Sequence, residues 1–192
     1  CDFLSGPAGE KEKEEYVKML VDEIRNCPDT VQNYRVISIF FGGGTPSLLT
    51  GEQIERLMDT VREIFTLDED AEITMEMNPG TVTEEKLRKY RQAGVNRLSI
   101  GLQSVNDEEL RLLGRIHTYE EFLEAYHLAR ANGFANINVD LISAIPGQTV
   151  ESWRRTLEQV MALSPEHISA YSLILEEGTT FYKKYVEDEA KE

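Results

Sequence analysis

The sequence has few cysteines and no long apolar run, and each shortage excludes a class of protein. Its only cysteines, Cys1 and Cys27, are too few for a disulfide framework, and we expect a reducing compartment, the cytoplasm. No stretch approaches the roughly 18 unbroken apolar residues that a membrane span requires. An integral membrane segment is therefore not expected.

Positive charge is also scarce. The 20 Lys and Arg residues face 35 Asp and Glu residues, which gives a formal net charge of −15. Binding along a phosphate backbone needs clustered Lys and Arg, so we expect no nucleic-acid partner. The acidic residues fall largely on predicted helix faces, where we interpret them as solvated surface.

Apolar residues alternate between helical and strand spacing along the whole chain. Thr50 with Gln53 and Thr118 with Glu121 have the spacing of capping boxes at helix starts. Strands are predicted at RVISIFF (35–41), AEITMEM (71–77), NRLSIGLQ (96–103), NINVDLI (136–142) and HISAYSLIL (167–175). Such alternation of strands and helices implies an α/β fold with parallel strands and right-handed crossovers.

Polar residues and glycines gather where the predicted strands end. The segment from Gly42 to Thr45 follows the first strand, and Glu76, Gln103 and Asp140 lie near the ends of the next three. In open α/β sheets and in (β/α) barrels, ligands bind at this edge of the sheet. One shared site is therefore predicted.

Side-chain alternation favours the barrel over the open sheet. If Met75 and Met77 face the outer helices, then Thr74 and Glu76 face inward, and Asp140 does the same on its own strand. A strand buried in an open sheet is more often apolar on both faces. The parity thus predicts a polar barrel interior.

The segment FGGGTP is ambiguous when taken alone. Glycine-rich turns between a strand and a helix also bind phosphate through backbone N–H groups. This turn lacks the Lys of a P-loop and the spacing of a G-x-G-x-x-G fingerprint. A (β/α)-barrel enzyme acting on a phosphorylated metabolite remains one hypothesis at this point.

Six segments together carry a resemblance to a known family. In order along the chain, they are CDF, FFGGGTPSLL, EMNPGTV, NRLSIGLQS, LLGRIHT and VDLISAIPGQT. The set resembles the radical SAM family of oxygen-independent coproporphyrinogen III oxidases and, more closely, its heme chaperone (HemW) branch. The resemblance implies a partial (β/α)6 TIM-like barrel.

The family binds a 4Fe-4S cluster through the three thiolates of a C-x3-C-x2-C motif, with S-adenosylmethionine on the fourth iron. Cys1 resembles the last of these cysteines. The resemblance then implies that residues 1–192 are a truncated radical SAM core domain with an incomplete ligand set. The other two cysteines and the first strand would lie upstream, which would leave RVISIFF as an exposed sheet edge, and the substrate domain would follow residue 192.

The resemblance also assigns contacts to S-adenosylmethionine residue by residue. Backbone groups of the glycine turn would meet its amino group, polar side chains its hydroxyl and ammonium groups, and an arginine its carboxylate. Ile174 matches an adenine contact by its position alone. No catalytic residue is assigned. The implied set is Gly43, Gly44, Thr45, Glu76, Gln103, Arg115, Asp140 and Ile174.

Two departures decide between the branches. The oxidase branch follows its last cluster cysteine with glycine and cysteine and tends towards GVQD, whereas this chain has CDFLS and GLQS. We therefore expect a radical SAM protein that binds heme and delivers it to acceptor proteins. The alternative is a coproporphyrinogen III oxidase, an oxidoreductase acting on a porphyrinogen, so whether the protein is an enzyme stays open.

Overall fold

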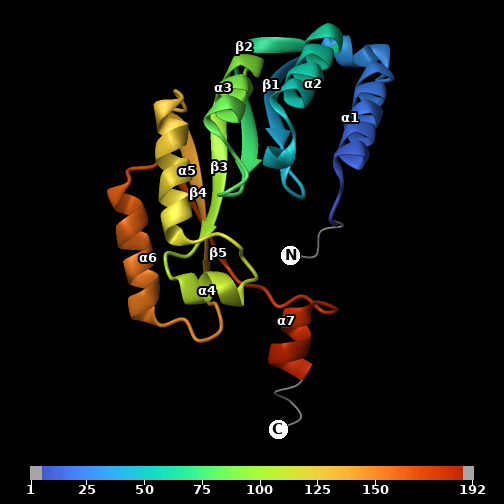
Figure 1. Cartoon of the computed structure of the whole chain (residues 1–192). Coiled ribbons are helices and arrows are strands. Elements are labelled where there is room, and N and C mark those ends of the chain that lie inside the picture. The colour runs from blue at the N-terminus through green and yellow to red at the C-terminus, as the bar shows by residue number, and fades with distance from the viewer. Residues whose placement is uncertain (1–5, 188–192) are drawn as a thin grey trace.

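The computed structural model describes residues 6–187, which fold around one parallel five-stranded sheet (Figure 1). The strands follow each other in the sheet in chain order. They are β1 (Arg35–Phe41), β2 (Thr66–Met77), β3 (Arg97–Gln103), β4 (Asn136–Ser143) and β5 (His167–Ser172). The predicted α/β class and parallel strands are confirmed.

Helices connect the strands. The α-helices are α1 (Glu10–Arg25), α2 (Gly51–Ile64), α3 (Glu84–Ala93), α4 (Asp107–Leu112), α5 (Tyr119–Ala131), α6 (Val150–Ala162) and α7 (Thr180–Tyr182). Two 3₁₀ helices cover Asp29–Asn33 and Pro46–Leu48, and a π-helical turn covers Lys183–Glu187. In the described part of the chain, no helix is long and apolar enough to cross a membrane.

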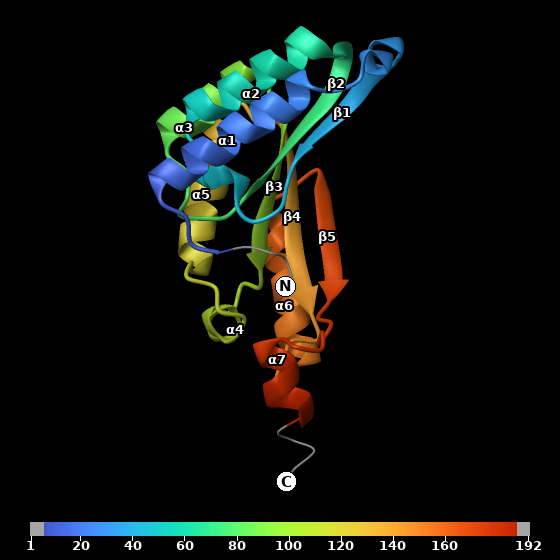
Figure 2. The ribbon, with the colours of Figure 1, turned by 90° about the vertical axis from the view of Figure 1, so that its right-hand side faces the viewer.

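The sheet is curled, and helices cover one of its faces. Figure 2 shows α1, α2, α3 and α5 along one side of the strands, while the opposite side has no covering helix among residues 6–187. This arrangement is a half-barrel whose concave face is open, as expected for a partial (β/α) barrel.

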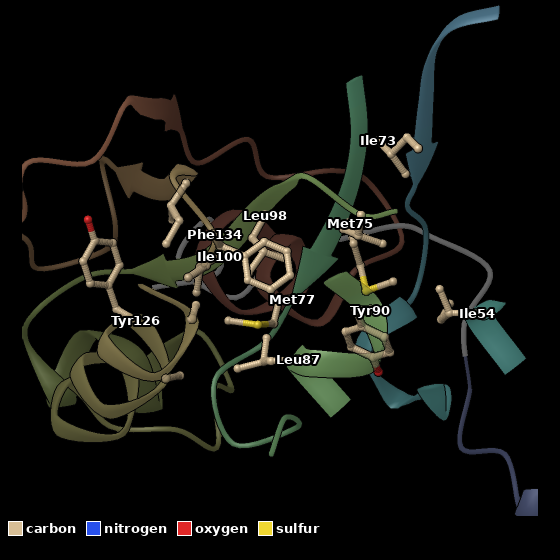
Figure 3. Close-up of a cluster of buried hydrophobic side chains, with 14 of the residues drawn as sticks. Ile54, Ile73, Met75, Met77, Leu87, Tyr90, Leu98, Ile100, Tyr126 and Phe134 are labelled. Carbon is tan, nitrogen blue, oxygen red and sulfur yellow. The ribbon is translucent and has the colours of Figure 1, made fainter. Parts of the chain in front are cut away.

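The hydrophobic core lies between the sheet and the helices. In Figure 3, Met75, Leu98 and Ile100 from the strands point towards Leu87 and Tyr90 of α3. All five side chains are fully buried. Burial of this apolar layer is the main force that holds the strands against the helices.

The concave face is polar instead. Thr74, Ser99 and Asn138 alternate with core residues along β2, β3 and β4, and all three are buried. The register pairs Ser99 with Glu76 on one side and with Asn138 on the other. The predicted inward direction of the polar residues is therefore confirmed.

Local signals set the helix ends as predicted. The Gln53 N–H donates to Thr50 Oγ1 at 3.2 Å, and the Thr50 N–H donates to Gln53 Oε1 at 2.9 Å. Thr118 and Glu121 form the same capping box at the start of α5. Gly94 ends α3 with a φ of 108°, a conformation that favours glycine.

The structure differs from the sequence-based prediction by more than one residue at two strand ends. β2 begins at Thr66 rather than residue 71, because Thr66 and Leu67 pair with Arg35 and Val36 of β1. β5 ends at Ser172, so the predicted strand is too long at its C-terminal end. β2 is extended by its pairing with β1, and β5 ends where its partner β4 ends, at Ser143.

The predicted exposed edge is confirmed in the described structure. β1 is the first strand of the sheet and pairs only with β2. Ile37 and Phe40 on this strand are 70% and 61% exposed, which is unusual for large apolar side chains in a sheet.

Candidate functional site

A cavity of about 250 Å³ lies where the strands end. Six of the predicted site residues line it, from strands and loops far apart in the chain: Gly44, Thr45, Glu76, Gln103, Arg115 and Asp140. Pro46, Met77, Asn78, Ser99 and Gly101 complete the lining. A larger cavity of about 420 Å³ between the starts of α4 and α6 contains none of the predicted residues.

Three predicted residues do not line this cavity. Gly43 lies beside it and donates its N–H to Glu76 Oε2 at 3.2 Å. Ile174 lies beyond the end of β5 and is 72% exposed, so the structure does not bring it to the cavity. Cys1 lies outside the described residues.

The glycine turn is explained by backbone conformation. Gly43 and Gly44 have φ values of 77° and 55°, and a Cβ added at either would meet no protein atom within 4 Å. A side chain is therefore disfavoured there by the positive φ. At Gly42 the reason is space, because a Cβ would lie 2.5 Å from the Phe40 ring.

Helix α3 fixes the segment that follows the glycines. Lys86 Nζ donates to the Ser47 carbonyl at 2.9 Å and to the Thr81 carbonyl at 3.1 Å. The Tyr90 hydroxyl donates to the Leu49 carbonyl at 2.5 Å. Burial lowers the pKa of Lys86 and raises that of Tyr90, as expected for polar ends held inside the protein.

Asn78 lies between the segment that follows the glycine turn and Arg115, and it contacts both. Its Nδ2 donates to Thr45 Oγ1 at 3.1 Å, and its backbone N–H donates to Ser47 Oγ at 3.3 Å. Its Oδ1 lies 3.5 Å from Arg115 Nη1, at the limit of a hydrogen bond. Asn78 is not among the predicted site residues, although its position directly after β2 within EMNPG is a usable signal.

The β3 end is equally constrained. Gln103 has a φ of 77°, which is uncommon for a residue with a side chain. A Cβ on Gly101 would lie 2.9 Å from Gln103 Nε2 and 3.2 Å from Asn78 Oδ1. Glycine at position 101 therefore makes room for the Gln103 and Asn78 amides at the cavity wall.

Two carboxylates and one guanidinium determine the charge of the cavity. Burial raises the pKa of Glu76, the Gly43 N–H opposes this, and the nearby Asp140 carboxylate raises it further. Burial lowers the pKa of Arg115, and the Asp140 carboxylate opposes this lowering only in part. A ligand that carries positive charge near Glu76 and Asp140 would relieve the repulsion between them.

A buried carboxylate holds the loop that presents Arg115. Glu109 on α4 is only 7% exposed and accepts hydrogen bonds from Ser104 Oγ at 2.7 Å and from Gln148 Nε2 at 2.8 Å. The Ser152 hydroxyl on α6 donates to its other oxygen. Glu109 thus joins the loops after β3 and β4, and α4 leads directly to Arg115.

Two histidines form hydrogen bonds within the fold. His117 is buried, and its Nε2 lies 3.2 Å from the Leu102 carbonyl. His167 Nδ1 lies 2.6 Å from Asn138 Oδ1. No group of three or more His, Cys, Asp or Glu side chains within residues 6–187 has a geometry that could hold a metal ion.

The chemistry of the cavity fits a zwitterionic ligand. Carboxylates at Glu76 and Asp140 accept from an ammonium or hydroxyl group, and Arg115 can pair with a carboxylate. S-Adenosylmethionine carries all of these groups. The phosphate hypothesis fits poorly, since the Gly43 N–H is already bonded to a carboxylate.

Glu76→Gln tests the effect of burial and of the Asp140 charge on Glu76. The raised pKa means that the folded chain keeps the Glu76 proton to higher pH than the unfolded chain, so stability falls as pH rises through that pKa. We expect the free energy of unfolding of the variant, relative to wild type, to increase from pH 4 to neutral pH and then level off. Urea denaturation at a series of pH values measures this.

Glu69→Gln is the matched control on the exposed part of β2, and its difference from wild type should not follow this pH course. A Glu76→Gln difference that is independent of pH would contradict the role of burial.

Glu109→Ala tests the connection that holds α4. The change leaves the buried hydroxyl of Ser104 and the half-buried amide of Gln148 without their acceptor, and a buried unsatisfied group costs about 1–3 kcal/mol. We expect a loss of unfolding free energy of at least this size, measured by urea denaturation. Glu108→Ala, at an exposed position of the same helix, should change stability by less than about 0.5 kcal/mol.

The chain is similar in sequence to a known protein family and to several of its members. The model of the radical SAM superfamily matches residues 1–160. The heme chaperone HemW of Escherichia coli is 44% identical over 94% of this chain and 48% of its own length. The mitochondrial radical S-adenosyl methionine domain-containing protein 1 of Danio rerio is 36% identical over 96% of this chain and 41% of its own length.

A solved structure agrees with the sequence relatives. The coproporphyrinogen III oxidase HemN of Escherichia coli, described as a radical SAM enzyme, superposes with a TM-score of 0.83 at 34% identity, over 92% of this chain and 41% of that protein. The chain thus spans about half the length of the curated relatives it matches, or less. From the family match over most of its length and from the shared half-barrel, we conclude that this chain belongs to the radical SAM superfamily.

Proposed function

We propose that this chain is the core domain of a radical SAM heme chaperone, a protein that binds heme and transfers it to acceptor proteins. The observation that carries the proposal is the likeness to a heme chaperone over nearly the whole chain. The identity to that relative is higher than the identity to the coproporphyrinogen oxidase.

Ser104 supports the choice of the chaperone over the oxidase. In this chain the fourth residue of GLQS is a fully buried serine that donates to Glu109 at 2.7 Å. An aspartate there, as in the GVQD of the oxidase branch, would place a second carboxylate against a buried one. The segment between β3 and α4 therefore suits a serine at position 104 better than an aspartate.

Radical SAM membership implies both S-adenosylmethionine and a 4Fe-4S cluster. Together these cofactors supply radical chemistry when they are bound. We propose Cys1 as one cluster ligand, with two further thiolates and the first barrel strand upstream of this chain. A substrate domain downstream would complete the protein.

The residues around the cavity have separate roles in binding S-adenosylmethionine. The turn at Gly43, Gly44 and Thr45 contacts its amino group, and Arg115 pairs with its carboxylate. The polar side chains that accept from its ammonium and ribose hydroxyl groups are Glu76, Gln103 and Asp140. Ile174 stays a proposed adenine contact, one that requires the exposed segment after β5 to approach the ligand.

Heme is the proposed cargo, and heme-acceptor proteins are the proposed partners. Porphyrinogen would take the place of heme if the oxidase alternative holds. The cytoplasm stays the predicted location. One relative is described as mitochondrial, so location is not a property shared by all relatives.

Arg115→Ala and Asp140→Ala test the proposed cofactor site. A charge-assisted hydrogen bond contributes about 1.5–3 kcal/mol, so each change should weaken S-adenosylmethionine binding roughly ten- to a hundredfold. Calorimetry on the full-length, cluster-reconstituted protein under anaerobic conditions measures the affinity. Arg111→Ala, an exposed arginine on α4, serves as the control and should bind normally. Unchanged affinity in both site variants would refute the assignment.

Heme retention and porphyrinogen turnover separate the two functions. The full-length protein is reconstituted anaerobically with its cluster and S-adenosylmethionine, then incubated either with heme or with coproporphyrinogen III. For a chaperone, heme stays bound through gel filtration, and no protoporphyrinogen forms. Turnover to protoporphyrinogen would overturn the chaperone assignment in favour of the oxidase.

A further inference from the structure

Asn138 is a buried amide whose hydrogen-bonding groups are all occupied. It lies on β4 two residues before Asp140, on the same concave face, and is 2% exposed. Its Nδ2 donates to Asp140 Oδ1 and to Ser99 Oγ, both at 2.8 Å. Its Oδ1 faces Ser169 Oγ at 3.0 Å and His167 Nδ1 at 2.6 Å.

The direction of each bond follows from the chemistry of the partners. An ionised Asp140 only accepts, so the amide must present its NH2 group to it. Ser99 Oγ donates to Asp140 Oδ2 at 2.8 Å and therefore accepts from Asn138. The amide oxygen then faces β5, and His167 must carry its proton on Nδ1.

The result is a carboxylate held at both oxygens. Asn138 holds Oδ1 of Asp140, Ser99 holds Oδ2, and both partners are themselves buried. Each carboxylate oxygen keeps further lone-pair capacity for a ligand in the cavity. A group fixed in advance loses little conformational freedom when a ligand binds.

We propose that Asn138 is a positioning residue of the S-adenosylmethionine site: its amide fixes the Asp140 carboxylate and ties it to β5 through His167 and Ser169. The proposal rests on the proposed function only in that Asp140 contacts this ligand. Nothing else among the described residues bonds to Asp140 Oδ1, so the position of that oxygen depends on Asn138.

Asn138→Asp separates positioning from space-filling. The new side chain has the same shape, so a residue that only fills space would tolerate it. An ionised carboxylate at position 138 cannot donate to Asp140 and repels it. At low pH, a proton shared by the two carboxylates would restore the hydrogen bond. The charged groups nearest the pair are Glu76 on β2, Arg115 after α4 and His167 on β5.

The affinity for S-adenosylmethionine is measured by calorimetry from pH 5.5 to 8.5 on the full-length, cluster-loaded protein. At each pH the variant is compared with wild type. We expect at least a tenfold weaker affinity at the alkaline end and recovery towards wild type at the acidic end. Asn136→Asp is the matched control: it makes the same change two residues earlier on β4, where no side-chain hydrogen bond is formed within the described residues.

A second readout does not need the cofactor. In the full-length protein labelled with ¹³C at aspartate carboxyls, the Asp140 signal is assigned by its loss in Asp140→Asn. In Asn138→Asp this signal should titrate at higher pH than in wild type, because the two carboxylates share a proton. An unchanged titration would overturn the contact between Asn138 and Asp140.

The outcomes separate this inference from the proposed function. If Asp140→Ala weakens binding and Asn138→Asp leaves it at the wild-type value at every pH, positioning by Asn138 is wrong and the cofactor site stands. If Asp140→Ala and Arg115→Ala also have no effect on binding, the proposed function of the site fails. In that case the carboxyl titration still decides whether Asn138 holds Asp140.

Discussion

The alternation of side chains along parallel strands is the constraint on which the rest of this structure depends. Met75, Leu98 and Ile100 must face the helices to be buried, and this sends their neighbours Thr74, Glu76 and Ser99 to the concave face. Because the strands are parallel, their C-terminal ends meet at one edge. Core packing therefore brings the polar residues of the site together.

The charged groups of the cavity carry an electrostatic cost in the folded protein. Glu76 and Asp140 repel each other in a partly buried cavity, and the positive charge of Arg115 is itself partly desolvated. Gln103 and two glycines adopt positive φ values around the same space. Strain and unfavourable charge of this kind are typical of binding sites, where the ligand supplies the missing compensation.

Buried and half-buried polar side chains outside the cavity keep its lining in place. Lys86 and Tyr90 hold the segment after the glycines, Glu109 holds the helix before Arg115, and Asn138 holds Asp140. Each satisfies hydrogen-bonding groups that would otherwise be costly to bury. The cavity wall is thus formed by strand ends and the loops that follow them, and surrounding polar side chains fix their geometry.

The sequence by itself determined the order of strands and helices, the capping boxes and the inward direction of Glu76 and Asp140, because these follow from local spacing. Its resemblance to a family also predicted that the glycine turn and Arg115 share one site, and the structure brings Gly44, Thr45 and Arg115 to one cavity. Only the tertiary structure decided the early start of β2, the contacts of Asn78 and Asn138, and the distance of Ile174 from the cavity. Those features depend on pairing between segments far apart in the chain, which no local pattern records.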